Sequence, residues 1–331
     1  MSQSSAARPW LTPLVPLYRL GLALREFELR IGLMPVHRLS RPVVSIGNLS
    51  TGGAGKTPLA ITLAKALAAR GLHVDVLSRG YGRRSTRTLR VETNGTAEEF
   101  GDEPLEIARE SGVPVYVAPD RYQAGLLAES LSASGLHFLD DGFQHRRLHR
   151  DVDILLLNRQ DWHDRLLPGG NLREPLSAVQ RATVIALPAD DPALEAEVKA
   201  RGWRGPVWRL ERRMELEPID GPVVAFCGIA RSAQFFEGLQ AAGVHLASRI
   251  AFPDHHCYKA HDIDCILEAA RTTRAVRFIT TQKDRLRLGT LAASFPSSTP
   301  LITAKLRIEI ENEDAAIDWL VDRLGPDKIH S

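Results

Sequence analysis

The stretch "IGNLSTGGAGKTP", residues 46–58, constrains the fold more than any other part of the chain. The apolar run "RPVVSIGN" leads into it and is typical of a buried strand, while "LAITLAKALAARG" follows with helical spacing and ends at a glycine. A strand, a glycine-rich loop and a helix in this order form a cradle in which backbone N–H groups and the helix N-terminus bind phosphate. We therefore expect an α/β fold with a phosphate-binding loop.

The composition of this loop indicates a nucleoside triphosphate and Mg²⁺. Lys56 would contact the terminal phosphates, and the Thr57 hydroxyl would ligate Mg²⁺. The standard pattern has a glycine five residues before Gly55, where this chain has Ser50. The alternative, a glycine-rich turn without a ligand, is disfavoured by the flanking strand and helix. The nucleotide-binding residues expected in the loop are Gly52, Gly53, Ala54, Gly55, Lys56 and Thr57.

A second buried strand, in "LHFLDDGFQHRRL", ends in Asp140 and Asp141. The carboxyl ends of parallel strands are where α/β proteins bind ligands, and a phosphate-binding loop needs a nearby carboxylate for its metal. One of the two aspartates is expected to face Mg²⁺, directly or through water. The alternative is an exposed turn that happens to carry two acids.

Strands alternate with helices along residues 42–189, which predicts a P-loop NTPase-like, mostly parallel sheet with helices on both faces. The alternation changes near residue 190 and restarts at residue 223, which indicates a smaller C-terminal α/β lobe over 190–331. Residues 1–41 form a third unit with an amphipathic helix. The last stretch, residues 290–331, carries no motif that indicates a function.

The charge and cysteine content excludes several classes of protein. The 42 Lys and Arg residues nearly balance the 40 Asp and Glu residues, so the net charge of +2 argues against a nucleic-acid binder. The three cysteines form no CxxC pair, which fits a reduced cytoplasm, and Cys227 is expected in the core. No run approaches the roughly 20 apolar residues of a transmembrane helix, and the N-terminus has no secretory signal.

The amphipathic segment spans residues 13–34 and has an apolar stripe with spacings of three and four. Such a helix, with arginines and an entry tryptophan, either packs on the protein's own core or lies in a membrane interface. The pattern by itself favours packing on the core. The stripe consists of Leu17, Leu20, Leu24, Phe27, Ile31 and Met34.

Three polar stretches could take part in catalysis, although each could also be a simple turn or helix cap. "FGDEP" contains Asp102, "FPDHHCY" contains His255 and His256, and "PGGNLREPLSAVQRA" contains Asn171 and Arg173. Taken with the phosphate loop, they form part of a larger set of motifs. The set is "GNLSTGGAGKTP", "SRGYGR", "GDEP", "LDDGFQHRRL", "PGGNLREPLSA", "FCGIARSAQF", "FPDHHCY" and "TTQKD".

This set resembles the tetraacyldisaccharide 4'-kinase family, and the resemblance runs from the N-terminal helix to about residue 290. It implies transfer of the γ-phosphate of ATP, with Mg²⁺, to the 4'-hydroxyl of tetraacyldisaccharide 1-phosphate, which gives lipid IVA in lipid A biosynthesis. Such a transfer needs cationic groups around the phosphates and a positioned base for the acceptor hydroxyl.

The resemblance also implies roles for individual residues. Asp102 matches the family's catalytic aspartate, His255 matches its histidine partner, and Lys56 completes the catalytic set. The sequence leaves open whether His255 or His256 is that partner. The residues expected to bind the lipid substrate are Arg79, Arg121, Asn171 and Arg173.

A four-chain lipid stays in its bilayer, so the resemblance changes the interpretation of the N-terminal helix to membrane docking. The implied place is the cytoplasmic face of the inner membrane of a Gram-negative bacterium, with no expectation about protein partners.

Two other interpretations remain. A GTPase is disfavoured, because in "FITTQKDRL" Lys283 directly precedes Asp284, whereas a guanine-binding loop has one residue between them. A non-enzymatic, membrane-associated ATP-binding scaffold would not need Asp102 or His255.

Overall fold

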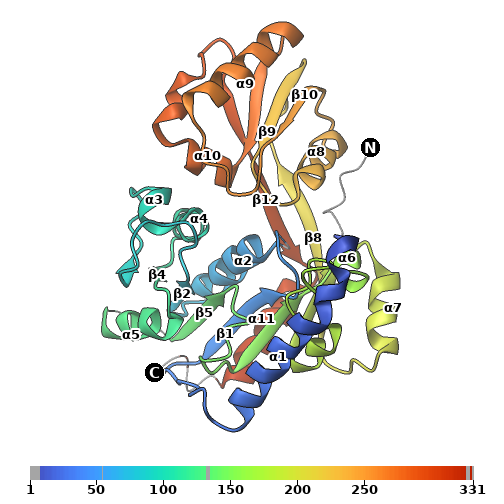
Figure 1. Cartoon of the computed structure of the whole chain (residues 1–331). Coiled ribbons are helices and arrows are strands. Elements are labelled where there is room, and N and C mark those ends of the chain that lie inside the picture. The colour runs from blue at the N-terminus through green and yellow to red at the C-terminus, as the bar shows by residue number, and fades with distance from the viewer. Residues whose placement is uncertain (1–7, 54, 132–134, 326–328, 330–331) are drawn as a thin grey trace.

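The computed structural model describes residues 8–53, 55–131, 135–325 and 329. Its described strands form one sheet in the order β10-β9-β11-β12-β8-β7-β6-β1-β5-β2-β4-β3, which runs through two lobes (Figure 1). The strands are β1 Val43–Asn48, β2 Val74–Ser78, β3 Leu89–Arg90, β4 Val115–Val117, β5 Leu136–Asp140, β6 Val152–Leu156, β7 Val184–Pro188, β8 Val207–Glu215, β9 Val223–Cys227, β10 Leu246–Ala251, β11 Arg277–Thr281 and β12 Leu301–Ile310.

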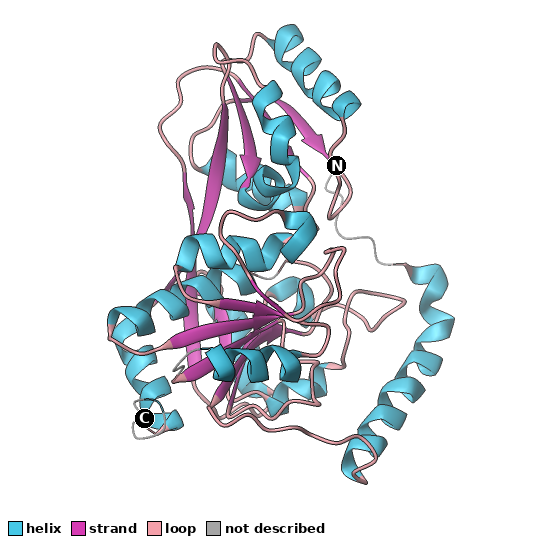
Figure 2. Cartoon of the chain, turned by 90° about the vertical axis from the view of Figure 1, so that its left-hand side faces the viewer, coloured by secondary structure: helices cyan, strands magenta, loops and turns pink. Residues whose placement is uncertain are grey.

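Helices surround the sheet in both lobes (Figure 2). The α-helices are α1 Val15–Arg30, α2 Lys56–Ala69, α3 Ala97–Phe100, α4 Asp102–Ser111, α5 Arg121–Leu131, α6 Arg159–Trp162, α7 Pro192–Ala200, α8 Ser232–Ala241, α9 Ala260–Thr273, α10 Gln282–Leu288 and α11 Glu313–Leu324. The 3-10 helices are η1 Pro9–Leu14, η2 Leu176–Arg181 and η3 Gly289–Ser294.

The predicted parallel α/β sheet is confirmed. Strand β1 pairs in parallel with β5 and β6, and in the second lobe β9 pairs in parallel with β10 and β11. Side chains alternate between the two faces of β6: Ile154 joins the core that includes α2, whereas Leu155 joins a separate core on the other face. Each face is therefore buried by helices, as expected for a parallel sheet. Cys227 lies in the core of the second lobe, as predicted.

Two long strands connect the lobes. The first part of β12 pairs with β11, and its second part, from Lys305 to Ile310, pairs antiparallel with β8. The following helix, α11, packs against α2 in the first lobe. The stretch that carried no motif thus supplies both a connecting strand and a core helix. Residues beyond 190 therefore contribute to both lobes. The division into 1–41, 42–189 and 190–331 stays a prediction about folding units.

The N-terminal helix packs through only one of its faces. Val15, Tyr18 and Leu22 contact the core beside η2 and α7. The pattern alone predicted that the apolar stripe packs on the protein's own core. This prediction is wrong for most of the stripe, because the stripe lies on the opposite face of the helix from the residues that contact the core. Its members Leu17, Leu20, Leu24, Phe27 and Ile31 are exposed, and Met34 is half-buried. Within the described residues, no helix is long and apolar enough to cross a membrane.

Candidate active site

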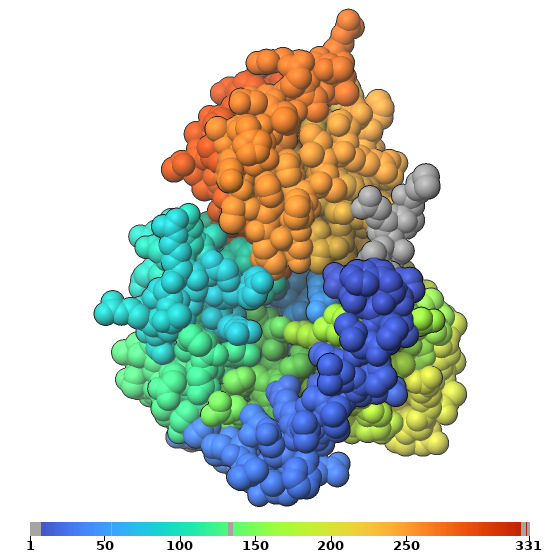
Figure 3. Space-filling model, in the orientation of Figure 1, coloured from blue at the N-terminus to red at the C-terminus, as the bar shows by residue number. Residues whose placement is uncertain are grey.

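A cavity of about 1170 Å³ lies between the two lobes. Its walls come from the loop after β1, the carboxyl ends of β2 and β5, the connecting strands β8 and β12, and α8 and α10 of the second lobe. Figure 3 shows one face of the boundary between the lobes, with α1 in dark blue beside it. The cavity is therefore at the edge of the sheet where α/β proteins bind ligands.

The glycine-rich loop forms one wall of this cavity. Gly52 and Gly55 have φ angles of 106° and 94°, a backbone region that side-chain-bearing residues rarely adopt. Gly55 is the N-cap of α2, so Lys56 and Thr57 occupy the first turn of that helix. Gly52, Gly53, Gly55, Lys56 and Thr57 all line the cavity, whereas Ala54 lies outside the described residues. The helix N-terminus and its loop thus point at the cavity, as phosphate binding requires.

Asp141 is held by two cations of the site. Its carboxylate accepts hydrogen bonds of 3.0 and 2.9 Å from both terminal nitrogens of Arg173 and lies 3.3 Å from Lys56 Nζ. Asn48 Oδ1 accepts from the same two cations, at 2.7 Å from Arg173 and 3.0 Å from Lys56. Burial opposes ionisation of Asp141, but Lys56 and Arg173 outweigh burial, so the pKa of Asp141 falls well below its usual range.

Asp140 lies in different surroundings, although it is the neighbouring residue. One carboxylate oxygen accepts a 3.2 Å hydrogen bond from the Ser78 hydroxyl, and the other is buried without a hydrogen-bond partner. Burial, followed by the charges of Glu103 and Asp141, raises the pKa of Asp140 to about 7. An unpaired buried carboxylate oxygen beside a phosphate loop suits a hard cation such as Mg²⁺.

The donor set around Asp140 also fits Mg²⁺ in its number of ligands. Among the residues that the structure describes, no three His, Cys, Asp or Glu side chains gather in a way that could hold a metal. Mg²⁺ commonly takes only one or two protein carboxylates and completes its coordination with water and substrate phosphates. Asp140 and Thr57, both buried and both lining the cavity, are therefore the residues that could hold it.

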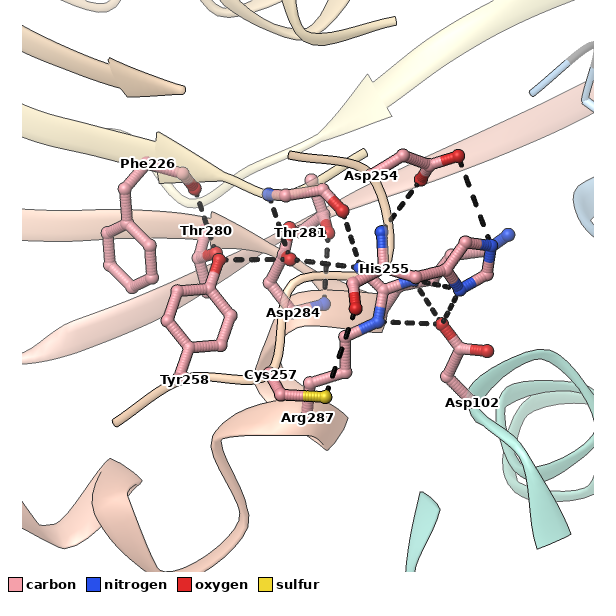
Figure 4. Close-up of polar contacts among 12 residues, drawn as sticks. Asp102, Phe226, Asp254, His255, Cys257, Tyr258, Thr280, Thr281, Asp284 and Arg287 are labelled. Atoms are coloured by element: carbon pink, nitrogen blue, oxygen red, sulfur yellow. Dashed lines mark hydrogen bonds and ion pairs between the residues drawn. The ribbon is translucent and has the colours of Figure 1, made fainter. Parts of the chain in front are cut away.

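Asp102 is the first residue of α4 and does not line the cavity itself, although Glu103 and Glu106 of the same helix do. It is buried, and it pairs with Arg287 of the second lobe, whose Nε lies 2.8 Å from Asp102 Oδ2. His255 Nδ1 lies 3.5 Å from the same oxygen (Figure 4). Burial raises the pKa of Asp102, but the contact with His255 and the charges of Arg287 and Lys283 lower it well below its usual range. The contact with Asp102 raises the pKa of His255.

The structure distinguishes the two histidines that the sequence left open. His256 Nε2 lies 3.0 Å from Asp262 Oδ2, and its ring stacks on Phe252. His255 lines the cavity and faces Asp102, with the Tyr81 ring centroid 4.9 Å from its own. His255 is therefore the histidine that can act with Asp102, whereas His256 supports the start of α9.

Three of the four residues predicted to bind the lipid substrate line the cavity: Arg79, Arg121 and Arg173. Arg121 Nη1 donates to the Pro119 carbonyl oxygen at 3.0 Å, while its Nε is buried without a partner. Burial and the nearby Arg79 lower the pKa of Arg121. Two close guanidinium groups favour an anionic ligand.

Asn171, the fourth predicted residue, does not line the cavity. Its side-chain amide donates to Asp164 at 2.8 Å, and its carbonyl oxygen accepts from the Thr51 N–H at 2.8 Å. It therefore supports the turn that lies against the glycine-rich loop.

Sequence reasoning missed several charged residues of the cavity: Glu103, Glu106, Lys283 and Arg287. Glu106 is buried, one of its oxygens has no hydrogen-bond partner, and burial raises its pKa to about 7. Lys283 and Arg287 lie four residues apart, which is a helical signal for two cations on one face. That signal was present in "KDRLR" but does not reveal what the face contacts.

These features define a P-loop phosphotransferase. They are a parallel sheet, a glycine-rich loop that precedes a helix, a carboxylate at the end of the neighbouring strand and an aspartate–histidine pair. The residues 7–325 match the family model described as Tetraacyldisaccharide-1-P 4'-kinase. The chain belongs to this family of kinases, as the motif resemblance predicted.

Curated relatives and a solved structure agree with this family. A tetraacyldisaccharide 4'-kinase from Koribacter versatilis is 42% identical over 322 residues, which cover 94% of this chain and 98% of that protein. Its counterpart from Anaeromyxobacter dehalogenans is 40% identical over 82% of this chain and 79% of its own length. The crystal structure of LpxK from Aquifex aeolicus in complex with ATP superposes with a TM-score of 0.74 and 30% identity, covering 97% of this chain and 100% of that one.

Proposed function

We propose that this protein transfers the γ-phosphate of ATP to the 4'-hydroxyl of tetraacyldisaccharide 1-phosphate, which gives lipid IVA and ADP. The observation that carries the proposal is that one cavity contains both the phosphate loop and His255, whose Nδ1 lies 3.5 Å from the carboxylate of the buried Asp102. A scaffold that only binds ATP would not need a buried carboxylate and a histidine facing one another beside the nucleotide. Membership of the kinase family supports the substrate.

In this proposal, the first lobe binds the nucleotide. Backbone N–H groups of the loop and the start of α2 bind the phosphates, and Lys56 balances the negative charge that spreads over the transferred group. Asp140 and Thr57 would hold Mg²⁺, which supplies further positive charge to the phosphate oxygens. Arg173 keeps Asp141 in place beside Lys56, so that Lys56 stays directed into the cavity.

Asp102 would act as the base for the acceptor. The 4'-oxygen attacks phosphorus, its proton passes to the Asp102 carboxylate, and the bond to the β–γ bridging oxygen breaks as ADP leaves. The low pKa of Asp102 keeps it ionised at neutral pH, and the acceptor hydroxyl becomes acidic only as its bond to phosphorus forms. His255 orients the carboxylate and can share the proton. Arg79 and Arg121 would bind the 1-phosphate of the substrate.

The N-terminal helix would bring the enzyme to its lipid, at the cytoplasmic face of the inner membrane of a Gram-negative bacterium. Support comes from the exposed apolar stripe on α1, which no described part of the chain covers. Arg19 and Arg30 on the same helix are also exposed and suit anionic headgroups. With α1 packed beside the cavity, the acyl chains of the substrate could stay in the bilayer while its sugar enters the site.

One assay tests the proposed reaction. Purified protein is mixed with γ-labelled ATP, Mg²⁺ and tetraacyldisaccharide 1-phosphate in detergent, beside a Lys56→Ala variant and a parallel reaction with γ-labelled GTP. Label in the lipid from ATP, absent from the variant, is the expected result. Lipid that stays unlabelled by folded, ATP-binding protein would refute the kinase and favour the scaffold. Faster transfer from GTP would refute the assignment of the nucleotide.

A further inference from the structure

The helix α10, which begins in the motif "TTQKD", has no part in the roles assigned above. It belongs to the second lobe, yet it contacts α4 of the first lobe. Lys283 and Arg287 lie one turn apart on α10, and they pair with Glu103 and Asp102 in the first turn of α4. Two cation–carboxylate pairs therefore cross between the lobes at the residue assigned as the base.

The buried Asp284 holds the Arg287 side chain in place. The Asp284 side chain accepts hydrogen bonds from the Gly228 N–H at 2.9 Å, the Tyr258 hydroxyl at 3.0 Å and the Thr281 hydroxyl at 2.6 Å. Arg287 Nη1 lies 3.3 Å from Asp284 Oδ1 and donates to the Gly228 carbonyl oxygen at 2.6 Å. Buried and held at several points, the guanidinium has little freedom to move (Figure 4).

The same anchor sets the position of His255. The backbone N–H of His255 donates to the Gly228 carbonyl oxygen at 3.1 Å. Arg287 contacts the same oxygen. Arg287 Nη2 lies 3.2 Å from His255 Nδ1 and also pairs with Asp102 Oδ2. One guanidinium thus touches the base, its histidine partner and the backbone that holds that histidine.

We propose that Arg287, anchored by Asp284, is a positioning residue for the phosphoryl transfer. Arg287 couples assembly of the Asp102–His255 pair to contact between the two lobes. This inference rests on the proposed kinase function. Asp102 and His255 come from different lobes, so neither element can set their geometry alone. Arg287 reaches across from the lobe of His255 and orients the Asp102 carboxylate through two of its nitrogens, as a forked donor can and an ammonium cannot.

A purely structural ion pair and a positioning residue differ in their effect on the pH profile. The charged groups facing Asp102 are Arg287 and Lys283 of α10, His255, and Glu103 and Glu106 of its own helix. Without Arg287, only His255 and Lys283 remain to oppose the effect of burial, so the pKa of Asp102 rises. The acid limb of the pH–kcat profile should then move to higher pH.

The test uses Arg287→Met, Arg287→Lys and a matched control, Lys305→Met. Lys305 also pairs with α4, through Glu110 at 2.9 Å, but this pair lies at the other end of that helix and does not line the cavity. We expect Arg287→Met to lower kcat by about 100-fold or more, to change KM for ATP by less than about threefold, and to move the acid limb up by about one pH unit. The kcat and the acid limb of Arg287→Lys should lie between those of Arg287→Met and the wild type. Lys305→Met should match the wild type in both.

Thermal unfolding and ATP binding identify variants that are folded. If Arg287→Met does not fold, the same test is made with Arg287→Lys, which keeps the buried positive charge. An unmoved acid limb in a folded Arg287 variant, or an equal loss of kcat in Lys305→Met, would overturn the inference. Wild-type protein that transfers no label to the lipid would instead refute the proposed function, so the two failures are distinguishable.

Discussion

Tyr18 of the N-terminal helix donates a 2.8 Å hydrogen bond to the backbone carbonyl oxygen of Arg173, whose guanidinium holds Asp141 in the cavity. Arg25 of the same helix donates to the carbonyl oxygen of Gln144, another residue of the cavity wall. One face of α1 is thus hydrogen-bonded to the site while its opposite face is apolar and exposed. A membrane that binds the exposed face would lie beside the cavity.

The double variant Leu20→Glu/Leu24→Glu should lose binding to vesicles that contain anionic lipid. The side chains are 55% and 54% exposed, so their replacement leaves the fold intact. Because burial of each leucine contributes about 1.5 kcal/mol or more, partitioning should fall by about 100-fold. Vesicle flotation measures it. Leu131→Glu, at a leucine 57% exposed on α5, is the matched control and should bind as the wild type does. Equal binding by all three proteins would contradict docking through α1.

Asp102→Asn should lower kcat by about 100-fold to 10,000-fold, because the amide cannot accept the proton from the acceptor hydroxyl. ATP binding should change by only a few-fold, since Asp102 lies on α4 and not in the phosphate loop. Single-turnover transfer and equilibrium nucleotide binding measure the two effects separately. A variant that keeps full transfer would remove Asp102 from the role of base.

Substitution of the two neighbouring aspartates should shift stability in opposite directions at pH 8 without nucleotide. The pKa of Asp140 is raised, so its ionised form is destabilising at this pH, and Asp140→Asn should stabilise the fold by about 1 kcal/mol. The pKa of Asp141 is lowered, so its carboxylate stabilises the fold above its unfolded pKa, and this contribution is lost in Asp141→Asn. Because its side chain is 37% exposed, we expect a loss of only about 1 kcal/mol.

Urea unfolding of the two variants and the wild type measures these changes in the free energy of unfolding. Shifts of the same sign would contradict the assignment of opposite surroundings. Asp140→Asn should also need more Mg²⁺ for half-maximal transfer, as expected for a residue that holds the metal.

The buried His137 should make stability depend on pH through a group that does not line the cavity. Its ring lies 2.7 Å from Asp75 and 3.4 Å from Glu129, and these contacts raise the pKa of His137 to about 9 despite burial. Its protonated form therefore stabilises the fold fully below about pH 6.5, and this contribution is lost as the pH rises through about 9. His137→Gln should cost about 3 kcal/mol at pH 6 and distinctly less at pH 9.5.

The measurement is the difference in unfolding free energy between variant and wild type at the two pH values, because titration of groups that do not interact with His137 cancels in that difference. His73→Gln, at an exposed histidine just before β2, is the control and should show no such change. A difference that stays constant between pH 6 and pH 9.5 would refute a protonated His137.

Local patterns in the sequence were enough to predict much of the molecule. The parallel sheet follows from apolar runs that alternate with helical spacing, and the phosphate loop follows from a short segment whose residues all lie on one turn. Lys56, Thr57 and the two aspartates at the end of β5 could be assigned to one edge of the sheet for the same reason. Such features depend on residues close to one another in the chain, where geometry is set by backbone periodicity.

Other parts depended on contacts between residues distant in the chain. Both His255 and His256 follow Asp254, and only the packing of the loop after β10 turns one toward Asp102 and the other toward Asp262. The sequence showed the charges of α10, but it did not show that they pair with α4 of the other lobe.

The sequence by itself determined the fold class, the phosphate loop and the family, because these are written in short contiguous motifs. The tertiary structure decided which histidine meets Asp102, that Arg287 links the two lobes there, and that the apolar stripe of α1 faces outward. Each of these depends on how two distant surfaces pack, and the free energy of that packing depends on shape and charge on both sides, which no single segment contains.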